Sequence, residues 1–182
     1  MNRSQYELYH YGVKGMKWGV RRKRESKDRY TPSERITLTG KIKSGKTITA
    51  KQLEEPKIAN FLAKHNLKMR KQVEATKNMD LFDDKGSKIG NMQLFHESPT
   101  SLNVVWITVN NKQRGRGYAQ TAMKMAEDYA RKSGANQMTL EVPGDSPDAR
   151  HIYEKQGFEV VGRISSEDDI WGGLTAMRKK LR

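Results

Sequence analysis

The chain has 182 residues, a formal net charge of +14 at pH 7 and no cysteine. This length fits about one domain, and the missing cysteines exclude disulfides and thiolate catalysis. No apolar stretch approaches the roughly 20 residues that cross a bilayer, and the N-terminus lacks the apolar stretch of a signal peptide. We therefore expect a soluble, cytoplasmic protein with no membrane association.

The positive charge is concentrated in the N-terminal part of the chain. Residues 1–30 carry a net charge of +6, residues 31–78 carry +7, and residues 79–182 carry only +1. Apolar residues within 1–34 follow no regular period, so this segment cannot bury a core of its own. We interpret residues 1–34 as a flexible basic segment that docks onto an acidic partner. The alternative is a tail that only aids solubility.

Residues 35–182 are predicted to fold as a domain that begins with a hairpin, a helix and an antiparallel meander. The hairpin is predicted over 35–49 and the helix over 51–65. The meander strands are predicted over 71–82, 88–96 and 103–109, with turn residues between them.

The hairpin turn contains a letter-for-letter match to the phosphate-loop pattern G-x-x-x-x-G-K-[ST], from Gly40 to Thr47. That pattern requires a helix that begins at its lysine and a parallel sheet behind it. Here β-branched residues and then Pro56 follow instead. We therefore interpret the segment as a lysine-rich turn, against the alternative of nucleotide hydrolysis. The four histidines show no metal-site spacing, so we predict no bound metal.

A second glycine-bearing loop follows the strand 103–109 and leads directly into a long helical pattern that Gly134 ends. Free N–H groups at such a helix start, together with roughly +0.5 charge from the helix dipole, bind anions. Gly115 and Gly117 let the backbone approach the anion closely. The loop therefore predicts a phosphate or pyrophosphate site.

The C-terminal third adds a strand over 138–142, a helix that Ser146 caps and Gly157 ends, and strands over 158–164 and 174–178. The order from residue 71 is therefore β, β, β, α, β, α, β, β. This order predicts an α+β fold with a mixed sheet.

Two of these segments resemble the GNAT superfamily of acetyl-CoA-dependent N-acetyltransferases. The family's loop motif, Arg/Gln-x-x-Gly-x-Gly/Ala, is present as Arg114 to Ala119, and its signature Ala-x-x-x-Tyr-x-x-x-Gly-Phe is present as Ala149 to Phe158. The resemblance covers 79–182 well and 35–78 only loosely. It implies a three-layer α/β/α fold with a central mixed, mostly antiparallel sheet. It also implies transfer of an acetyl group to a primary amine by direct attack.

The resemblance further implies how acetyl-CoA would bind. The backbone of the loop would hold the pyrophosphate, with added charge from two arginines. The strand would pair with the pantetheine arm, chiefly through Ile107 and Val109, in a splay between strands 104–109 and 138–142. Ser146 would contact the pantetheine, or would only cap its helix. The implied coenzyme-binding residues are Ile107, Thr108, Val109, Arg114, Gly115, Arg116, Gly117, Tyr118, Ala119 and Ser146.

The implied catalytic acid is Tyr153, which would protonate the departing thiolate; the alternative is a purely packing aromatic. A freed strand amide would polarise the thioester carbonyl. The strand 103–109 has no carboxylate, so Glu141 and Glu97 are the candidate bases. Either glutamate is alternatively a surface residue, with a water chain or an already neutral amine in its place.

Residues 9–22 resemble a short tag on head and structural proteins of tailed bacteriophages. The tag implies a phage-encoded protein, in the host cytoplasm or in the virion. Residues 1–30 would bind a capsid protein or nucleic acid, where aromatic stacking and phosphate contacts act together. The alternative function is a catalytically silent phage structural or DNA-binding accessory protein.

Overall fold

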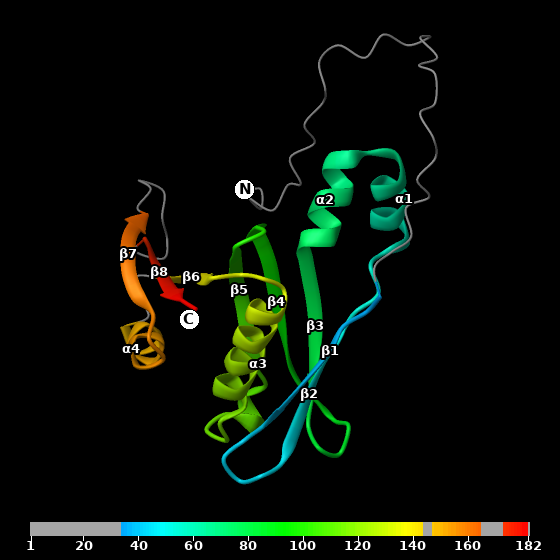
Figure 1. Ribbon diagram of the computed structural model, residues 1–182. Coiled ribbons are helices and arrows are strands. Elements are labelled where there is room, and N and C mark those ends of the chain that lie inside the picture. Colours follow the sequence, from blue (N-terminus) through cyan, green and yellow to red (C-terminus); the bar gives the residue numbers. More distant parts are fainter. Residues whose placement is uncertain (1–33, 144–146, 165–172, 182) are drawn as a thin grey trace, which may run out of the picture.

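The structure is a computed structural model that describes residues 34–143, 147–164 and 173–181. The described residues form one eight-stranded sheet and four α-helices (Figure 1). The strands are β1 Thr37–Lys41, β2 Thr47–Gln52, β3 Thr76–Phe82, β4 Lys88–Ser98, β5 Ser101–Val109, β6 Gln137–Pro143, β7 Glu159–Ile164 and β8 Leu174–Lys180. The helices are α1 Lys57–His65, α2 Leu67–Ala75, α3 Tyr118–Lys132 and α4 Pro147–Lys155. In this part of the chain, no helix is long and apolar enough to cross a membrane.

The sheet has the strand order β1-β2-β3-β4-β5-β6-β8-β7. β5 and β6 are parallel, and every other neighbouring pair is antiparallel. The predicted α+β class with a mixed, mostly antiparallel sheet is confirmed, as is the predicted element order through β3 to β8. The α3 crossover explains the parallel pair, because parallel neighbours need a connection long enough to return the chain to the same end of the sheet.

The core lies between α3 and the face of the sheet that α3 covers, which we call the inner face. Apolar residues recur at helical spacing along α3, so that Ala122, Ala126 and Ala130 are fully buried against strand residues such as Met92 and Leu94. The small alanines let the helix approach the strands closely. This packing fixes the start of α3 relative to β5.

The β1–β2 hairpin packs against α3. Ile42, in its turn, is 7% exposed and belongs to the core. Gly40 lies so close to α3 that a Cβ atom there would be 2.7 Å from Cγ2 of Thr121. Within the turn, the Gly45 N–H donates to the Ile42 carbonyl at 2.9 Å. No helix begins at Lys46, and β2 follows from Thr47 in an antiparallel pair with β1, so the predicted hairpin turn is confirmed.

The predictions for 51–65 and 71–82 were wrong in part. β2 continues to Gln52, and α1 begins only after Pro56, because a proline is tolerated at a helix start but not inside it. The residues just before β3 are helical, since the Asn66 side chain accepts hydrogen bonds from two N–H groups and caps α2. The large apolar side chains of α1 lie mostly outside the core, since Ile58 is 70% exposed and Phe61 is 59% exposed.

Candidate active site

The two parallel strands separate shortly after they begin. β5 pairs with β6 at three positions, Ser101 with Gln137, Leu102 with Met138, and Asn103 with Thr139. Beyond these pairs no ladder joins the two strands in the described residues. A register shift against β4 places a bulge at Val105, which bends β5 at this point. The predicted splay between strands 104–109 and 138–142 is therefore present.

The backbone of β5 faces the splay at alternate residues. The Asn110 N–H donates to the Ile89 carbonyl on β4 at 2.8 Å. Because backbone groups of a strand point alternately to its two neighbours, Thr108 also faces β4, and Ile107 and Val109 face the splay. The Thr108 hydroxyl donates to Asn91 on β4 at 2.8 Å. The structure therefore does not bring Thr108 into the splay, unlike the other two predicted strand residues.

The loop before α3 has the geometry of an anion cradle. Gly115 and Gly117 have φ angles of +77° and +83°, which other residues adopt only with strain. The first helical hydrogen bond in this turn runs from the Thr121 N–H to the Gly117 carbonyl at 3.0 Å. Within the described chain, the N–H groups from Gly115 to Gln120 donate to no other residue. These donors and the helix dipole together favour an anion.

A cavity of about 610 Å³ opens on the inner side of the splay. Its walls are Ile107 and Val109 of β5, the segment 113–120, Tyr153 with its neighbours on α4, and Lys43 and Ser44 of the β1–β2 turn. The cavity thus brings together the predicted loop residues, two of the strand residues and the predicted catalytic tyrosine. Ser146 lies outside the described residues.

The charged side chains at the wall of this cavity are all positive among the described residues. Its described lining includes Lys43, Arg114 and Arg116 but no carboxylate. Among the described residues, no carboxylate lies within ion-pair distance of these three cations. The cations and the free N–H groups of the loop are therefore available to a ligand with several negative charges. Lys43 and Ser44 were missed in the sequence, where the signal was the lysine-rich turn itself.

Tyr153 lies at the wall of the cavity and against the core. Its ring meets Phe158 edge to face, with centroids 6.0 Å apart. Burial raises the pKa of the Tyr153 phenol above its ordinary value, because a phenolate would lose its hydration. The side chain therefore stays protonated at neutral pH, as an acid must. The structure accommodates both the acid role and the packing role.

Glu97 and Glu141 lie away from the inner cavity. Glu97 accepts hydrogen bonds from the Ser101 hydroxyl at 2.8 Å, the Thr139 hydroxyl at 3.0 Å and the Asn103 amide at 3.4 Å. These donors come from the short paired segment of β5 and β6, so Glu97 holds the closed end of the splay together. Glu141 is exposed two residues beyond Thr139, on the same face of β6.

A second pocket, of about 570 Å³, lies on the opposite side of β5, which we call the outer face. Trp106 and Thr108 line it from β5, with Asp80 from β3 and Glu54 from the segment after β2. Sequence reasoning missed this pocket. The alternation of Trp106 and Thr108 with Ile107 and Val109 is the signal that would have indicated a second lined face.

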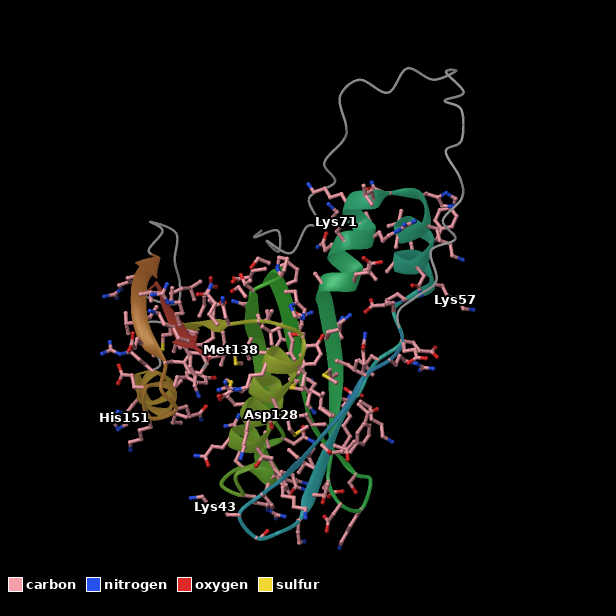
Figure 2. The ribbon with its side chains drawn as sticks, viewed as in Figure 1. Lys43, Lys57, Lys71, Asp128, Met138 and His151 are labelled. Carbon is pink, nitrogen blue, oxygen red and sulfur yellow. The ribbon has the colours of Figure 1, made fainter. Side chains whose placement is uncertain are left out.

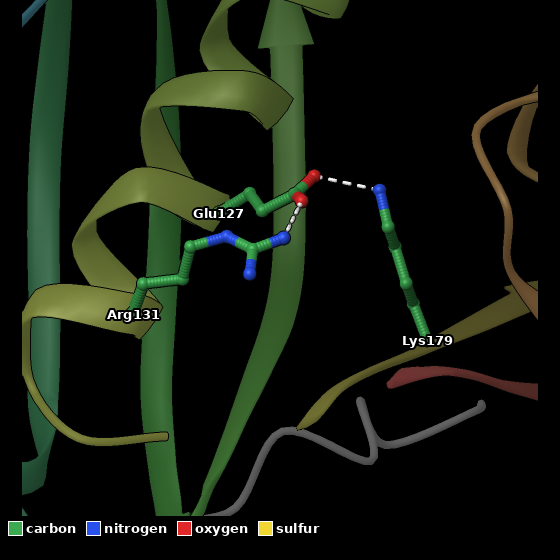
Figure 3. A network of polar contacts seen from close by, with 3 residues as sticks. All are labelled: Glu127, Arg131 and Lys179. Atoms are coloured by element: carbon green, nitrogen blue, oxygen red, sulfur yellow. Dashed lines mark hydrogen bonds and ion pairs between the residues drawn. The ribbon is translucent and has the colours of Figure 1, made fainter. Parts of the chain in front are cut away.

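A polar network joins the two sides of the splay on the inner face (Figure 3). Glu127 of α3 accepts from Lys179 Nζ of β8 at 2.7 Å and from Arg131 Nη2 at 2.6 Å. Burial alone would raise the pKa of Glu127, but the hydrogen bonds and charges of Lys179 and Arg131 lower it below the usual value. The network therefore ties α3 to the strands beyond the splay.

Comparison with known proteins identifies the family. A sequence model of the acetyltransferase (GNAT) family matches residues 67–158, and a model of a family of unknown function (DUF7211) matches residues 1–25. Acetyltransferase Atu2258 of Agrobacterium fabrum is 29% identical over 114 residues, which span 63% of this chain and 78% of that protein. Streptothricin acetyltransferase of Streptomyces lavendulae is 36% identical over 65 residues, 36% of this chain and 34% of that protein.

The solved structures agree on the fold. A GNAT family acetyltransferase from Elizabethkingia anophelis, solved with acetyl-CoA bound, superposes with a TM-score of 0.58 at 14% identity, covering 74% of this chain and 98% of that one. The family match spans half of the sequence, from α2 to the end of the tyrosine signature, and includes the loop, the splay and most of the cavity wall. The chain therefore belongs to the acetyltransferase (GNAT) family and is an N-acetyltransferase.

Proposed function

We propose that the protein transfers an acetyl group from acetyl-CoA to a primary amine by direct attack. The observation that carries this proposal is the inner cavity, whose walls offer the free N–H groups of the segment 115–120 beside the unpaired backbone of β5. The loop and its two arginines suit the diphosphate. Ile107 and Val109 would pair with the pantetheine arm as an added strand does.

The proposed chemistry needs no covalent enzyme intermediate. A backbone N–H in the splay, at Ile107 or beside it, polarises the thioester carbonyl. The amine nitrogen attacks that carbon, the C–N bond forms and the C–S bond breaks. Tyr153 gives its proton to the leaving thiolate, and Glu141 accepts the proton that the amine loses. We assign Glu97 a positioning role, because three donors already occupy its carboxylate.

The acceptor is proposed to approach from the outer face. The outer pocket offers the aromatic ring of Trp106, which suits an ammonium group. Its carboxylates Glu54 and Asp80 form ion pairs with Arg35 at 2.9 Å and with Lys88 at 2.8 Å, so an acceptor ammonium would replace one of these cations. A relative is a streptothricin acetyltransferase by name. We therefore propose an acceptor panel of streptothricin, an aminoglycoside, a polyamine and a lysine peptide, scored by the release of free thiol.

Isothermal titration with acetyl-CoA tests the donor directly. We expect saturable binding with one site, and weaker binding to a CoA fragment that lacks the diphosphate. If the full-length protein does not bind acetyl-CoA at millimolar concentration, the proposed donor is wrong. If it binds acetyl-CoA but releases no thiol with any amine tested, the catalytically silent alternative is favoured.

For residues 1–30, outside the described part of the chain, we propose docking to a phage capsid protein or to nucleic acid. The net charge of +6 supports this proposal, and the match to a family of unknown function sets residues 1–25 apart from the acetyltransferase match. The full-length protein with Arg21, Arg22, Lys23 and Arg24 changed to glutamine tests it. If nucleic acid is the partner, affinity falls steeply with salt in the parent and less in the variant. A flat salt response in both would exclude nucleic acid.

A further inference from the structure

The β1–β2 turn reaches the cavity from a part of the chain that carries no family motif. Lys43 and Ser44 line the cavity together with the loop before α3. Figure 2 shows Lys43 at the tip of the hairpin, next to the start of α3. The family match begins at residue 67, so this wall of the cavity belongs to the segment that the match leaves out.

The turn holds Lys43 in a fixed place. Its neighbour Ile42 is buried in the core, and the Ile42 N–H donates to the Lys46 carbonyl at 3.0 Å. The strand before it packs on α3 through Gly40, where even a Cβ atom would collide with Thr121. The backbone of Lys43 is therefore positioned relative to the first turns of α3, and only its flexible side chain has to adjust to a ligand.

Two lysines of the turn differ in whether they form an ion pair. Lys46 forms an ion pair with Asp84 at 3.8 Å and does not line the cavity. Lys43, three residues earlier, has no carboxylate within ion-pair distance in the described part of the chain and faces the cavity. An unpaired cation at the wall of a cavity that already contains two arginines favours a further negative group on the ligand.

We infer that Lys43 binds the 3′-phosphate of coenzyme A, with Ser44 as a second donor from the same turn. The inference rests on the proposed function. A diphosphate bridge carries about one negative charge per phosphate, whereas a phosphate monoester carries about −1.5 to −2 at pH 7. The N–H groups of the segment 115–120 suit the diphosphate. The monoester is the remaining strong anion, and the lysine ammonium is a point charge suited to it.

The test compares two ligands that differ by one group. Acetyl-CoA and 3′-dephospho-acetyl-CoA are titrated into the full-length protein and into Lys43→Gln, Lys43→Arg and Lys46→Gln. We expect Lys43→Gln to weaken acetyl-CoA binding about three- to tenfold, the range for a partly exposed charged contact. Binding of the dephospho ligand should not change. Lys46→Gln removes the same charge from the same turn, outside the cavity, and should bind as the parent does.

The readouts separate the sources of any loss. Lys43→Arg should recover most of the affinity, and kcat at saturating donor should stay at the parental value in Lys43→Gln while KM rises. An equal loss for both ligands would assign Lys43 to the diphosphate and overturn the inference, as would no loss at all. If the parent protein binds neither ligand, it is the proposed function that fails, and this outcome is distinct from the other two.

Discussion

The inner cavity recognises anions with two regions that work in different ways. The loop before α3 offers backbone N–H groups, which two glycines with positive φ angles aim toward the cavity. The β1–β2 turn offers a side-chain cation on a hairpin that the core holds in place. Backbone donors depend on the conformation of the loop, so a single substitution that changes this conformation can remove them from the site. A side-chain charge adds less binding free energy, its contribution depends on salt, and another cationic residue can replace it.

The largest expected effect comes from Gly117→Glu. A glutamate there forces a side-chain residue into a φ of +83° and places a negative charge in the anion site. We expect acetyl-CoA affinity to fall by more than about 100-fold, measured by titration calorimetry. Gly86→Glu is the matched control, since Gly86 has a φ of +78° in the β3–β4 turn and open space around it. Equal losses in the two variants would show that strain alone is responsible.

The next effect tests the tyrosine. Tyr153→Phe keeps the ring contact with Phe158 and removes the proton, so turnover should fall about 10²-fold with little change in acetyl-CoA affinity. In the parent protein, the raised pKa of Tyr153 should keep the acid active past the ordinary tyrosine value. Tyr129→Phe serves as the control, because Tyr129 bonds His96 at 3.2 Å and does not line the cavity. Parental turnover in Tyr153→Phe would leave only the packing role.

A third pair of variants separates the two glutamates. Glu141→Gln should lower kcat about tenfold or more and leave the KM for acetyl-CoA near the parental value, as loss of a general base does. Glu97→Ala should instead raise the KM for acetyl-CoA and leave kcat near the parental value, because the closed end of the splay loses the acceptor of three hydrogen bonds. If kcat falls in Glu97→Ala and not in Glu141→Gln, the two roles are exchanged.

The smallest effect concerns stability. Glu127→Gln should lower the free energy of unfolding by about 1 kcal/mol at pH 7, since both bonded cations lose their carboxylate. The pKa of Glu127 is lower in the folded protein than its ordinary value. The stabilisation is therefore present at neutral pH and disappears as pH falls through that lowered pKa. Urea unfolding at pH 7 and pH 3 measures this loss of free energy. Glu154→Gln is the control: it removes a more exposed ion pair, with Arg150, and should have a smaller effect.

The loop could be predicted from the sequence because it depends on local signals, and the splay and Tyr153 could be predicted because two short motifs carry the family resemblance. Glycine spacing and an apolar strand before an amphipathic helix define the loop, and the resemblance supplied the tyrosine and the splay. Thr108 was misplaced because a motif does not say which neighbour a strand residue's backbone faces, and the bond from Asn110 to Ile89 decides that. Lys43 was missed because it is more than 70 residues from Arg114 in the sequence, and only tertiary packing brings the two to one cavity.

The three paired positions between β5 and β6 have a mechanical consequence. Among the described residues, this short seam is the only backbone ladder between β6 and β5, and Glu97, Asn103, the Thr100 carbonyl, the Glu127 network and the packing on α3 add to it. A coenzyme bound in the splay would connect the two parts of the sheet on either side of this seam. It would form hydrogen bonds to one part and pack against the other. Amide hydrogen exchange along β6 and β8 should then slow when acetyl-CoA is added, while exchange in β3 and β4, on one side of the seam, stays the same.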